Sequence, residues 1–178
     1  PATSKGARTM NILILVAEIA PFSHVGGLAR GTHALAKALC KRGHDVRVLT
    51  PMHAASYDFL RATKHRLHTE KIMTMPSLKQ GLRGKSVSIR SFRRNAIDEH
   101  VYFVDYPDYF RLRSQPYGYM DDYKRYYLFS LACADWLSVL RKEGKGWFPD
   151  VIQCHDWHTG YFVDLIKKNP AYIRIRRI

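Results

Sequence analysis

The stretch Asn11–Leu28 constrains the fold more than any other part of this chain. It opens with the near-continuous apolar run Asn11–Ala17, passes through a turn at Pro21, reaches the pair Gly26-Gly27 and leads into a helical pattern. Apolar runs of this length are typical of strands that are buried on both faces of a parallel sheet. The stretch therefore predicts a strand, a glycine-containing turn and a helix.

The next segments complete a β-turn-α-β unit. Leu28–Arg42 carries leucines at helical spacing, and Gly43 stands where a helix C′ cap is expected. Asp45–Thr50 alternates in polarity like a strand, which Pro51 ends. This unit predicts an α/β fold with a doubly wound, Rossmann-like parallel sheet.

The rest of the chain continues the α/β pattern. We expect a polar, basic and mobile region from the second strand to about Ser86, and a loop at Tyr106–Tyr119. Two strands that flank Arg93–His100 can form a hairpin. The remaining predicted elements are strands at Val87–Phe92, Val101–Val104, Pro149–Cys154 and Ile173–Ile178, and helices at Asp121–Arg141 and Tyr161–Lys168.

The domain prediction follows from the two ends of the chain. Residues 1–9 are expected to be a disordered leader or a remnant, and residues 10–178 form one domain. A doubly wound sheet rarely ends on a fresh strand with no helix to cover it. We therefore expect that the domain is truncated after Ile178.

Composition limits the function classes. No apolar run approaches the ~18 residues that a membrane span requires, and the first ten residues lack the apolar core of a secretory signal. The three cysteines are scattered without a C-x-x-C pair, which disfavours a disulfide scaffold or a zinc site and favours the cytoplasm. We expect no metal ion in the site.

The positive charge is uneven. The net charge is +14, and Arg61–Arg94 holds ten Lys or Arg residues against one Glu. No helix-turn-helix, RNP or zinc-finger signature accompanies this charge, so nucleic acid is a disfavoured partner. A solvated basic surface, or one that steers an anionic ligand, is the expected role.

Two turns are the candidate sites, because ligands of open α/β sheets bind outside the carboxyl ends of the strands. At Gly26 and Gly27, backbone N–H groups beside a helix N-terminus can hold a phosphate or a sugar hydroxyl. The alternative is a tight connection without a ligand. The pair is not a G-x-G-x-x-G fingerprint, so NAD binding has little support.

The second turn is His155–Gly160. Here His155 can donate to a hydroxyl group, and Asp156 can orient it. Alternatively, Asp156 caps a helix while Trp157 packs in the core. A zinc site from His155 and His158 lacks an obvious third ligand.

Asp121-Asp122 precedes the longest predicted helix, where carboxylates cap the N-terminus and favour the helix dipole. Tyrosines between Tyr102 and Tyr127 can stack on sugar rings or simply pack.

Several of these motifs together resemble those of bacterial glycogen synthases and plant starch synthases. They are AE-x-APF-x-x-VGGLA, HALAKALCKRGHDVRVLTP, FVDYPDYF, DD-x-x-RYYLFS-x-A and PDVIQCHDWHTG, which occur in family order over about Met10–Ile178. The resemblance implies the N-terminal, acceptor-side half of a GT-B glycosyltransferase, without its C-terminal nucleotide-binding domain. It implies glucose transfer from ADP-glucose, or UDP-glucose in some relatives, to the non-reducing end of an α-1,4-glucan, with retention and without a cofactor or metal. A plant protein of this kind would be plastid-located. We expect the fragment alone to be inactive.

The resemblance also implies roles for single residues. Gly26 and Gly27 match the pair that approaches the donor phosphates, and Glu18 matches the Glu after the first strand. His155 matches the His that contacts the transferred glucose. Asp121 matches an Asp near both sugars.

Three positions depart from the family pattern. His24 stands where the family usually has the Lys of K-x-G-G-L, so one fixed cation is lost. Arg30 replaces a usual Asp, and Gln153 replaces the first His of H-x-H-D-W-H. These changes leave open a different donor, a slower enzyme, or a non-catalytic glucan-binding or regulatory module.

Overall fold

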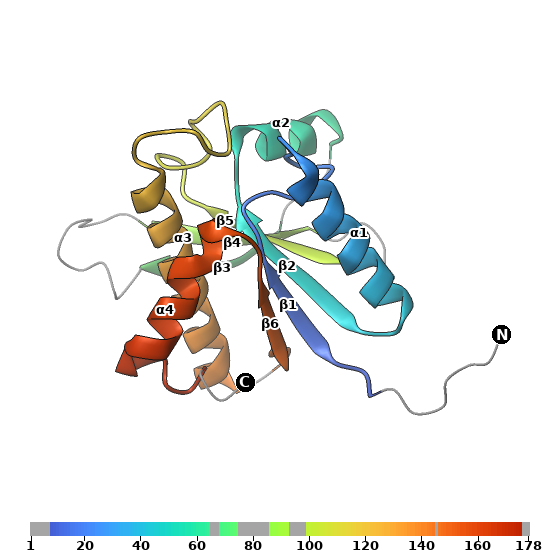
Figure 1. The fold of residues 1–178 in the computed structure, drawn as a ribbon, viewed down its shortest axis with the longest axis vertical. Helices are drawn as coiled ribbons and strands as arrows, with labels where there is room; N and C mark the ends of the chain where they lie inside the picture. The colour runs from blue at the N-terminus through green and yellow to red at the C-terminus, as the bar shows by residue number, and fades with distance from the viewer. Residues whose placement is uncertain (1–7, 65–67, 75–85, 93–98, 145, 176–178) are drawn as a thin grey trace.

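The computed structural model describes residues 8–64, 68–74, 86–92, 99–144 and 146–175. They form one six-stranded sheet flanked by helices (Figure 1). The strands are β1 (Asn11–Leu15), β2 (Asp45–Pro51), β3 (His68–Thr74), β4 (Ser86–Phe92), β5 (His100–Asp105) and β6 (Val151–Cys154). The helices are α1 (Gly27–Lys41), α2 (Ala54–Ala62), α3 (Asp122–Glu143), α4 (Gly160–Lys168) and the short 3₁₀ turns η2 (Trp157–Thr159) and η3 (Pro170–Tyr172).

The strand order places a topological switch point beside β1. The order is β3-β4-β5-β2-β1-β6, in which β5, β2, β1 and β6 are parallel and β3 and β4 are antiparallel additions at one edge. The chain runs from β1 through β2 to β5 in one direction, and then returns to β6 on the other side of β1. In open α/β sheets the ligand crevice lies at such a reversal. The two predicted site turns follow β1 and β6, so they flank it.

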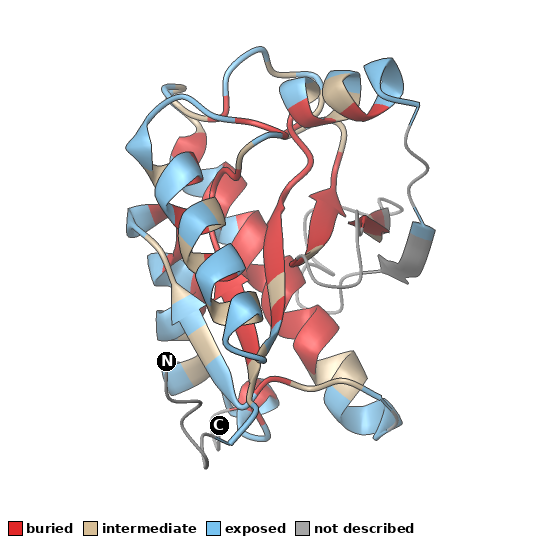
Figure 2. Cartoon of the chain, turned by 90° about the vertical axis from the view of Figure 1, so that its right-hand side faces the viewer, coloured by how far each residue is buried: buried red, intermediate tan, exposed pale blue. Residues whose placement is uncertain are grey.

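Helices cover both faces of the sheet, as predicted. α1 lies on one face, and α3 and α4 lie on the other (Figure 1). Side chains of β1 alternate between two core clusters: Leu13 and Leu15 pack toward α3, whereas Ile12 and Ile14 pack toward α1. β1, β2 and β5 are mostly buried, the edge strand β6 is partly exposed, and the outer helix surfaces are exposed (Figure 2). The predicted doubly wound fold is confirmed.

Local signals placed several boundaries correctly. Gly43 has φ of +90°, and its N–H donates to the carbonyl of Cys40, as expected of a C′ residue that ends α1. The predicted hairpin is also present, because β4 and β5 pair antiparallel.

Two predictions about secondary structure are wrong. The region expected to be mobile contains α2 and β3. In α2 only Ser56 and Leu60 are buried, so its apolar pattern is weak, and β3 depends on pairing with β4. Six of the ten Lys and Arg residues between Arg61 and Arg94 lie outside the described residues.

The strand expected from Ile173 is the other error. Asn169 accepts a hydrogen bond from the N–H of Ala171, which starts η3, and a turn follows over residues 173–175. The Tyr172 hydroxyl donates to Asp135 at 2.8 Å, and Ile175 is buried in the core. The alternation of this segment resembles that of a strand, but tertiary contacts hold it as a turn. Residues 176–178 lie outside the described part.

Candidate functional site

Glu18 organises the loop that follows β1. Its side chain is fully buried, and its carboxylate accepts hydrogen bonds from the backbone N–H groups of Val25 at 2.6 Å and Gly26 at 3.4 Å. The Tyr117 hydroxyl donates to the same carboxylate at 3.5 Å. Glu18 therefore faces the inside of the loop, where it fixes the path of the chain into α1.

The glycine pair lies at the entrance of α1 without packing against the domain. Gly26 has an extended backbone, and Gly27 is the first residue of α1. A Cβ atom added at either glycine would meet no heavy atom within 4 Å. Since Gly26 already donates to Glu18, the N–H groups of the first turn that begins at Gly27 are those left for a ligand.

His24 and Arg30 meet beside this helix entrance. The Nη2 atom of Arg30 lies 3.4 Å from Nε2 of His24, and both side chains are exposed. A guanidinium can only donate, so Nε2 of His24 is the acceptor in this pair. The fixed positive charge next to position 24 is therefore that of Arg30, whose direction the sequence alone left undetermined.

The turn after β6 is tied to the end of β1. The backbone N–H of His155 donates to the carbonyl of Leu15 at 3.0 Å, so the two predicted turns lie at the same edge of the sheet. Asp156 has φ of +63°, and its side chain accepts from the N–H of Trp157 at 2.6 Å. Asp156 thus caps η2, as one alternative predicted, but Trp157 is 52% exposed and is not a core residue.

Of the two histidines of this turn, His158 is buried and His155 is half-buried. Among the described residues, no hydrogen-bond partner exists for the buried Nε2 of His155 or for either ring nitrogen of His158. Burial lowers the pKa of both side chains. His158 stacks on Trp157 with ring centroids 3.9 Å apart and contacts Tyr126 at 4.5 Å. The His155 ring is therefore a neutral group that can exchange a hydrogen bond with a ligand.

The two aspartates before α3 have different roles. The Asp121 carboxylate lies 2.7 Å from the Arg113 guanidinium in a partly exposed ion pair, and it makes no side-chain capping bond to the helix. Asp122, the first residue of α3, makes no capping bond to the helix either; its carboxylate accepts from the N–H groups of Gly118 at 2.6 Å and Tyr119 at 3.0 Å in the preceding loop, so the predicted side-chain cap is absent at both aspartates. These bonds hold the preceding loop against the start of α3.

Asp122 also balances a buried cation that sequence reasoning missed. Arg125 is fully buried, pairs with Asp122 and donates through Nε to the carbonyl of Tyr109 at 2.6 Å. Its Nη2 atom has no partner among the described residues. The spacing of three between Asp122 and Arg125 on a helix was visible in the sequence, and could have indicated this pair.

His53 is the second residue missed. It follows β2, is 1% exposed, and shares a 2.7 Å hydrogen bond between Nε2 and the carbonyl of Ala17. The pKa of His53 is lowered to about 4, mainly by burial. The bond to Ala17 opposes this shift, and the nearby Arg125 charge contributes to it. Ligands of open α/β sheets bind outside the carboxyl ends of the strands. That rule indicated the turns after β1 and β6, and it could also have indicated His53, which follows β2.

Metal and membrane roles find no support in the described residues. No three His, Cys, Asp or Glu side chains of this part lie close enough to share a metal ion, so the zinc alternative gains no third ligand. None of the helices described has the length and apolar content that a membrane crossing requires.

The doubly wound domain matches one Rossmann-like half of a GT-B glycosyltransferase, the class of a solved structure that it resembles. That structure is the catalytic domain of starch synthase IV from Arabidopsis thaliana bound to ADP and acarbose. It is 28% identical with a TM-score of 0.69, over 92% of this chain and 31% of that one. A family model described as the starch synthase catalytic domain matches residues 11–176. The chain belongs to this family.

Curated relatives agree with the family assignment. The glycogen synthase of Lacticaseibacillus casei is 33% identical over 165 residues, which cover 93% of this chain and 32% of the relative. The glycogen synthase of Geotalea daltonii is 34% identical over 172 residues, which cover 91% of this chain and 32% of the relative. The chain thus spans about a third of the length of these relatives.

Proposed function

We propose that this domain is the acceptor-side half of a synthase that transfers glucose from ADP-glucose to the non-reducing end of an α-1,4-glucan with retention. UDP-glucose is the alternative donor. The observation that carries the proposal is the hydrogen bond from His155 to Leu15, which holds the two site turns at one edge of the sheet. The family membership and the ADP and acarbose of the Arabidopsis relative support the choice of ligands.

Different residues act on the two ends of the donor, its diphosphate and its glucose. The first-turn N–H groups from Gly27, together with the Arg30 guanidinium, stabilise the diphosphate as negative charge builds on it. The neutral ring of His155 bonds a hydroxyl of the transferred glucose. Asp156 holds that turn in shape, and Asp121 lies at the start of α3 toward the acceptor. The bond between the anomeric carbon and the diphosphate oxygen breaks while the acceptor hydroxyl oxygen bonds to that carbon on the same face; the hydroxyl proton passes to the diphosphate, and the nucleoside diphosphate leaves.

The half-site character of the domain gives a direct test. The chain alone, incubated with ADP-glucose and glycogen, should transfer no measurable glucose, because the donor-binding second domain is required to complete the cleft. A full-length polypeptide that contains this domain should transfer glucose under the same conditions. Steady transfer by the isolated chain would overturn the half-site proposal.

A non-catalytic glucan-binding or regulatory module is the second candidate. It is favoured by His24, an imidazole where the resemblance leads us to expect a lysine. This candidate predicts glucan binding without transfer in the full-length polypeptide. Transfer with a donor affinity that depends on Arg30 would exclude it.

A further inference from the structure

Tyr117 lies in the loop between β5 and α3, and its neighbours on both sides are anchored to α3. The Tyr126 hydroxyl donates to the Pro116 carbonyl at 2.7 Å, and the Gly118 N–H donates to Asp122 at 2.6 Å. The backbone at Tyr117 is therefore fixed relative to the helix, and its side chain projects from a fixed base.

The Tyr117 side chain contacts both site turns. Its hydroxyl donates to Oε1 of Glu18 in the turn after β1 at 3.5 Å, and its ring centroid lies 5.0 Å from that of His158 in the turn after β6. Burial, the Glu18 charge and the hydrogen bond to Glu18 raise the pKa of the Tyr117 hydroxyl, so it stays protonated and remains a donor at neutral pH. Tyr117 therefore joins the loop before α3 to both turns.

The Glu18 carboxylate depends on few donors. It is fully buried, and its donors in the described part of the chain are the N–H groups of Val25 and Gly26 and the Tyr117 hydroxyl. A buried carboxylate is stable only where such donors satisfy it. Of the three, the Tyr117 hydroxyl is the one that reaches Glu18 from outside the loop after β1.

The end of the turn after β1 relies on hydrogen bonds rather than on packing. Residues 24–27 are exposed, and a Cβ atom at Gly26 or Gly27 would meet no heavy atom within 4 Å. A shift of the Glu18 carboxylate therefore passes through Val25 and Gly26 to the first turn of α1. The direction of the N–H groups that begin at Gly27 depends on where Tyr117 holds Glu18.

We propose that Tyr117 is a positioning residue for the donor: its hydroxyl fixes the Glu18 carboxylate, which in turn directs the first-turn N–H groups from Gly27 toward the diphosphate. The diphosphate as ligand rests on the proposed function, whereas the link from Tyr117 through Glu18 rests on contacts within this chain. Because Tyr117 acts through the turn after β1, its loss should weaken the donor and spare the acceptor.

The test uses Tyr117→Phe, which removes the hydroxyl and keeps the ring, in the full-length polypeptide. Tyr119→Phe is the matched control in the same loop. The Tyr119 hydroxyl lies 3.1 Å from Oγ of Ser114 and accepts from the N–H of Gln115 at 2.9 Å, so its bonds stay within the loop.

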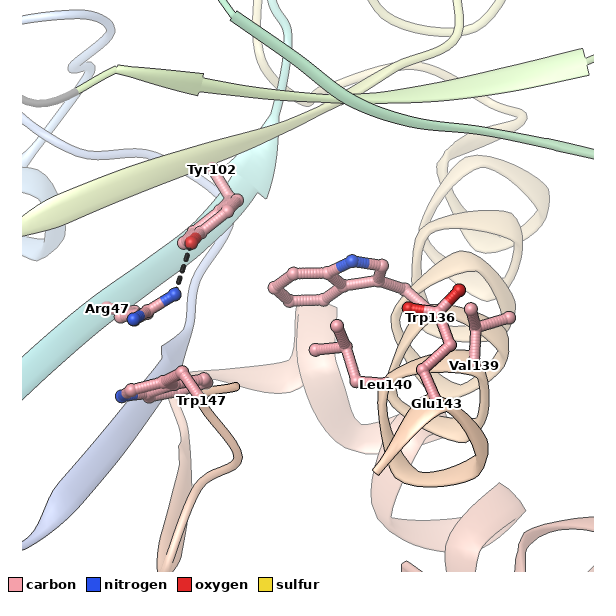
Figure 3. A pocket seen from close by; sticks show the side chains of 7 residues that line it. All are labelled: Arg47, Tyr102, Trp136, Val139, Leu140, Glu143 and Trp147. Carbon is pink, nitrogen blue, oxygen red and sulfur yellow. Dashed lines mark hydrogen bonds between the residues drawn. The ribbon is translucent and has the colours of Figure 1, made fainter. Parts of the chain in front are cut away.

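Tyr102→Phe is a second control, for the loss of a hydroxyl from a buried tyrosine elsewhere in the domain. The Tyr102 hydroxyl accepts from the Arg47 guanidinium (Figure 3). The Tyr102 ring packs 4.9 Å from that of Trp136, which is 14 residues beyond Asp122 on α3, or about 21 Å along the helix axis. This variant reports what a general loss of stability does to the donor.

Tyr117→Phe should raise the Kd of ADP, measured by calorimetry, roughly threefold to tenfold, because a hydrogen bond to a charged group is lost. The KM of ADP-glucose should rise with it, while the KM of glycogen stays within about twofold. A variant that only folded less well would lower kcat and leave both KM values unchanged. Both controls should bind ADP within about twofold of the wild type. Equal ADP affinities in Tyr117→Phe and Tyr119→Phe would overturn the proposal.

The path through Glu18 is tested by a double-mutant cycle with Glu18→Gln. In that background, Tyr117→Phe should change the ADP affinity by less than about twofold, because the carboxylate on which the hydroxyl acts is gone. The full effect in the Glu18→Gln background would refute this path. If Glu18→Gln does not fold, the comparison of Tyr117→Phe with Tyr119→Phe still decides the outcome.

Hydrogen exchange distinguishes a failure of this inference from a failure of the proposed function. Mass spectrometry of the peptide that spans residues 18–27 requires no ligand. Tyr117→Phe should accelerate exchange of the Val25 and Gly26 amides, because their acceptor is no longer fixed, and Tyr119→Phe should not. Wild-type exchange in Tyr117→Phe would overturn the positioning role. If the wild type binds no ADP but the acceleration is seen, the donor site fails and the link from Tyr117 to the turn stands.

Discussion

The pair of His24 and Arg30 gives the sharpest prediction about the donor site. Arg30→Gln removes the guanidinium that lies beside His24 and keeps a polar side chain there. His24→Lys restores the family's usual cation, but places a second positive charge where the guanidinium now lies 3.4 Å from the His24 ring. The two substitutions should therefore be non-additive.

The magnitude follows from the exposure of both side chains. Two unit charges about 4 Å apart interact by about 1 kcal/mol in water and about 4 kcal/mol near a protein surface. Because Arg30 is exposed, the lower part of this range applies, so Arg30→Gln should weaken ADP binding by about 1 to 2 kcal/mol, roughly 5- to 30-fold. His24→Lys alone should change the affinity by less than about threefold, since repulsion from Arg30 offsets the gain. In the Arg30→Gln background the same change should restore most of the lost affinity.

The assay is calorimetric titration of the full-length polypeptide with ADP and with ADP-glucose at fixed ionic strength. Lys37→Gln is the matched control, because Lys37 is an exposed cation of the same helix. It lies about 10 Å from Arg30 along the axis, beyond the Debye length of about 8 Å. If Arg30→Gln weakens binding no more than Lys37→Gln does, Arg30 does not face the donor. If His24→Lys produces the same gain in both backgrounds, the two side chains are not coupled.

Three further predictions concern the groups that hold the site in shape. Glu18→Ala should lower the free energy of unfolding in urea by about 2 to 4 kcal/mol, because two loop N–H groups lose their acceptor, and a loss below about 0.5 kcal/mol would contradict its structural role. Asp122→Asn should lower the free energy of unfolding by about 3 to 5 kcal/mol, because Arg125 is left as an uncompensated buried charge. Asp121→Asn should lower it by less than about 1 kcal/mol, because the Asp121–Arg113 pair is partly exposed. Equal losses in the two variants would refute this distinction. The folded pKa of His53, about 4, is below its ordinary 6.5, so the unfolded chain binds more protons and stability falls as the pH drops from about 6.5 to 4. Over that range the wild type should lose about 3 kcal/mol relative to His53→Gln, and parallel stability curves for the two proteins would show that His53 does not titrate this way.

Much of the fold could be predicted because its signals are local. The apolar run of β1, the alternation of β2 and the glycine that ends α1 each specify a conformation within a few residues. The prediction failed where a pattern was weak or ambiguous, as in α2 and in the segment after Pro170. In those places contacts with distant residues decide the conformation.

In the candidate site, too, some features could be predicted from local sequence and others depend on distant contacts. The sequence identified the turns that contain Gly26 and His155, since both follow strands, and the strand order then placed them together at the switch point. It missed His53 and Arg125, whose importance comes from burial. A histidine or arginine has no distinctive local pattern when it is buried, because burial depends on what packs against it.

The sequence by itself therefore determined the class of the fold, and it predicted the two candidate turns. Only the tertiary structure decided that Arg30 lies beside His24, that the Glu18 carboxylate accepts from two loop N–H groups, and that Asp122 rather than Asp121 binds the loop before α3. Periodicity and turn chemistry act over a few neighbouring residues, so they can be read along the chain. Hydrogen-bond partners and charge pairs depend on which elements meet in space, and the order of the strands and helices sets that.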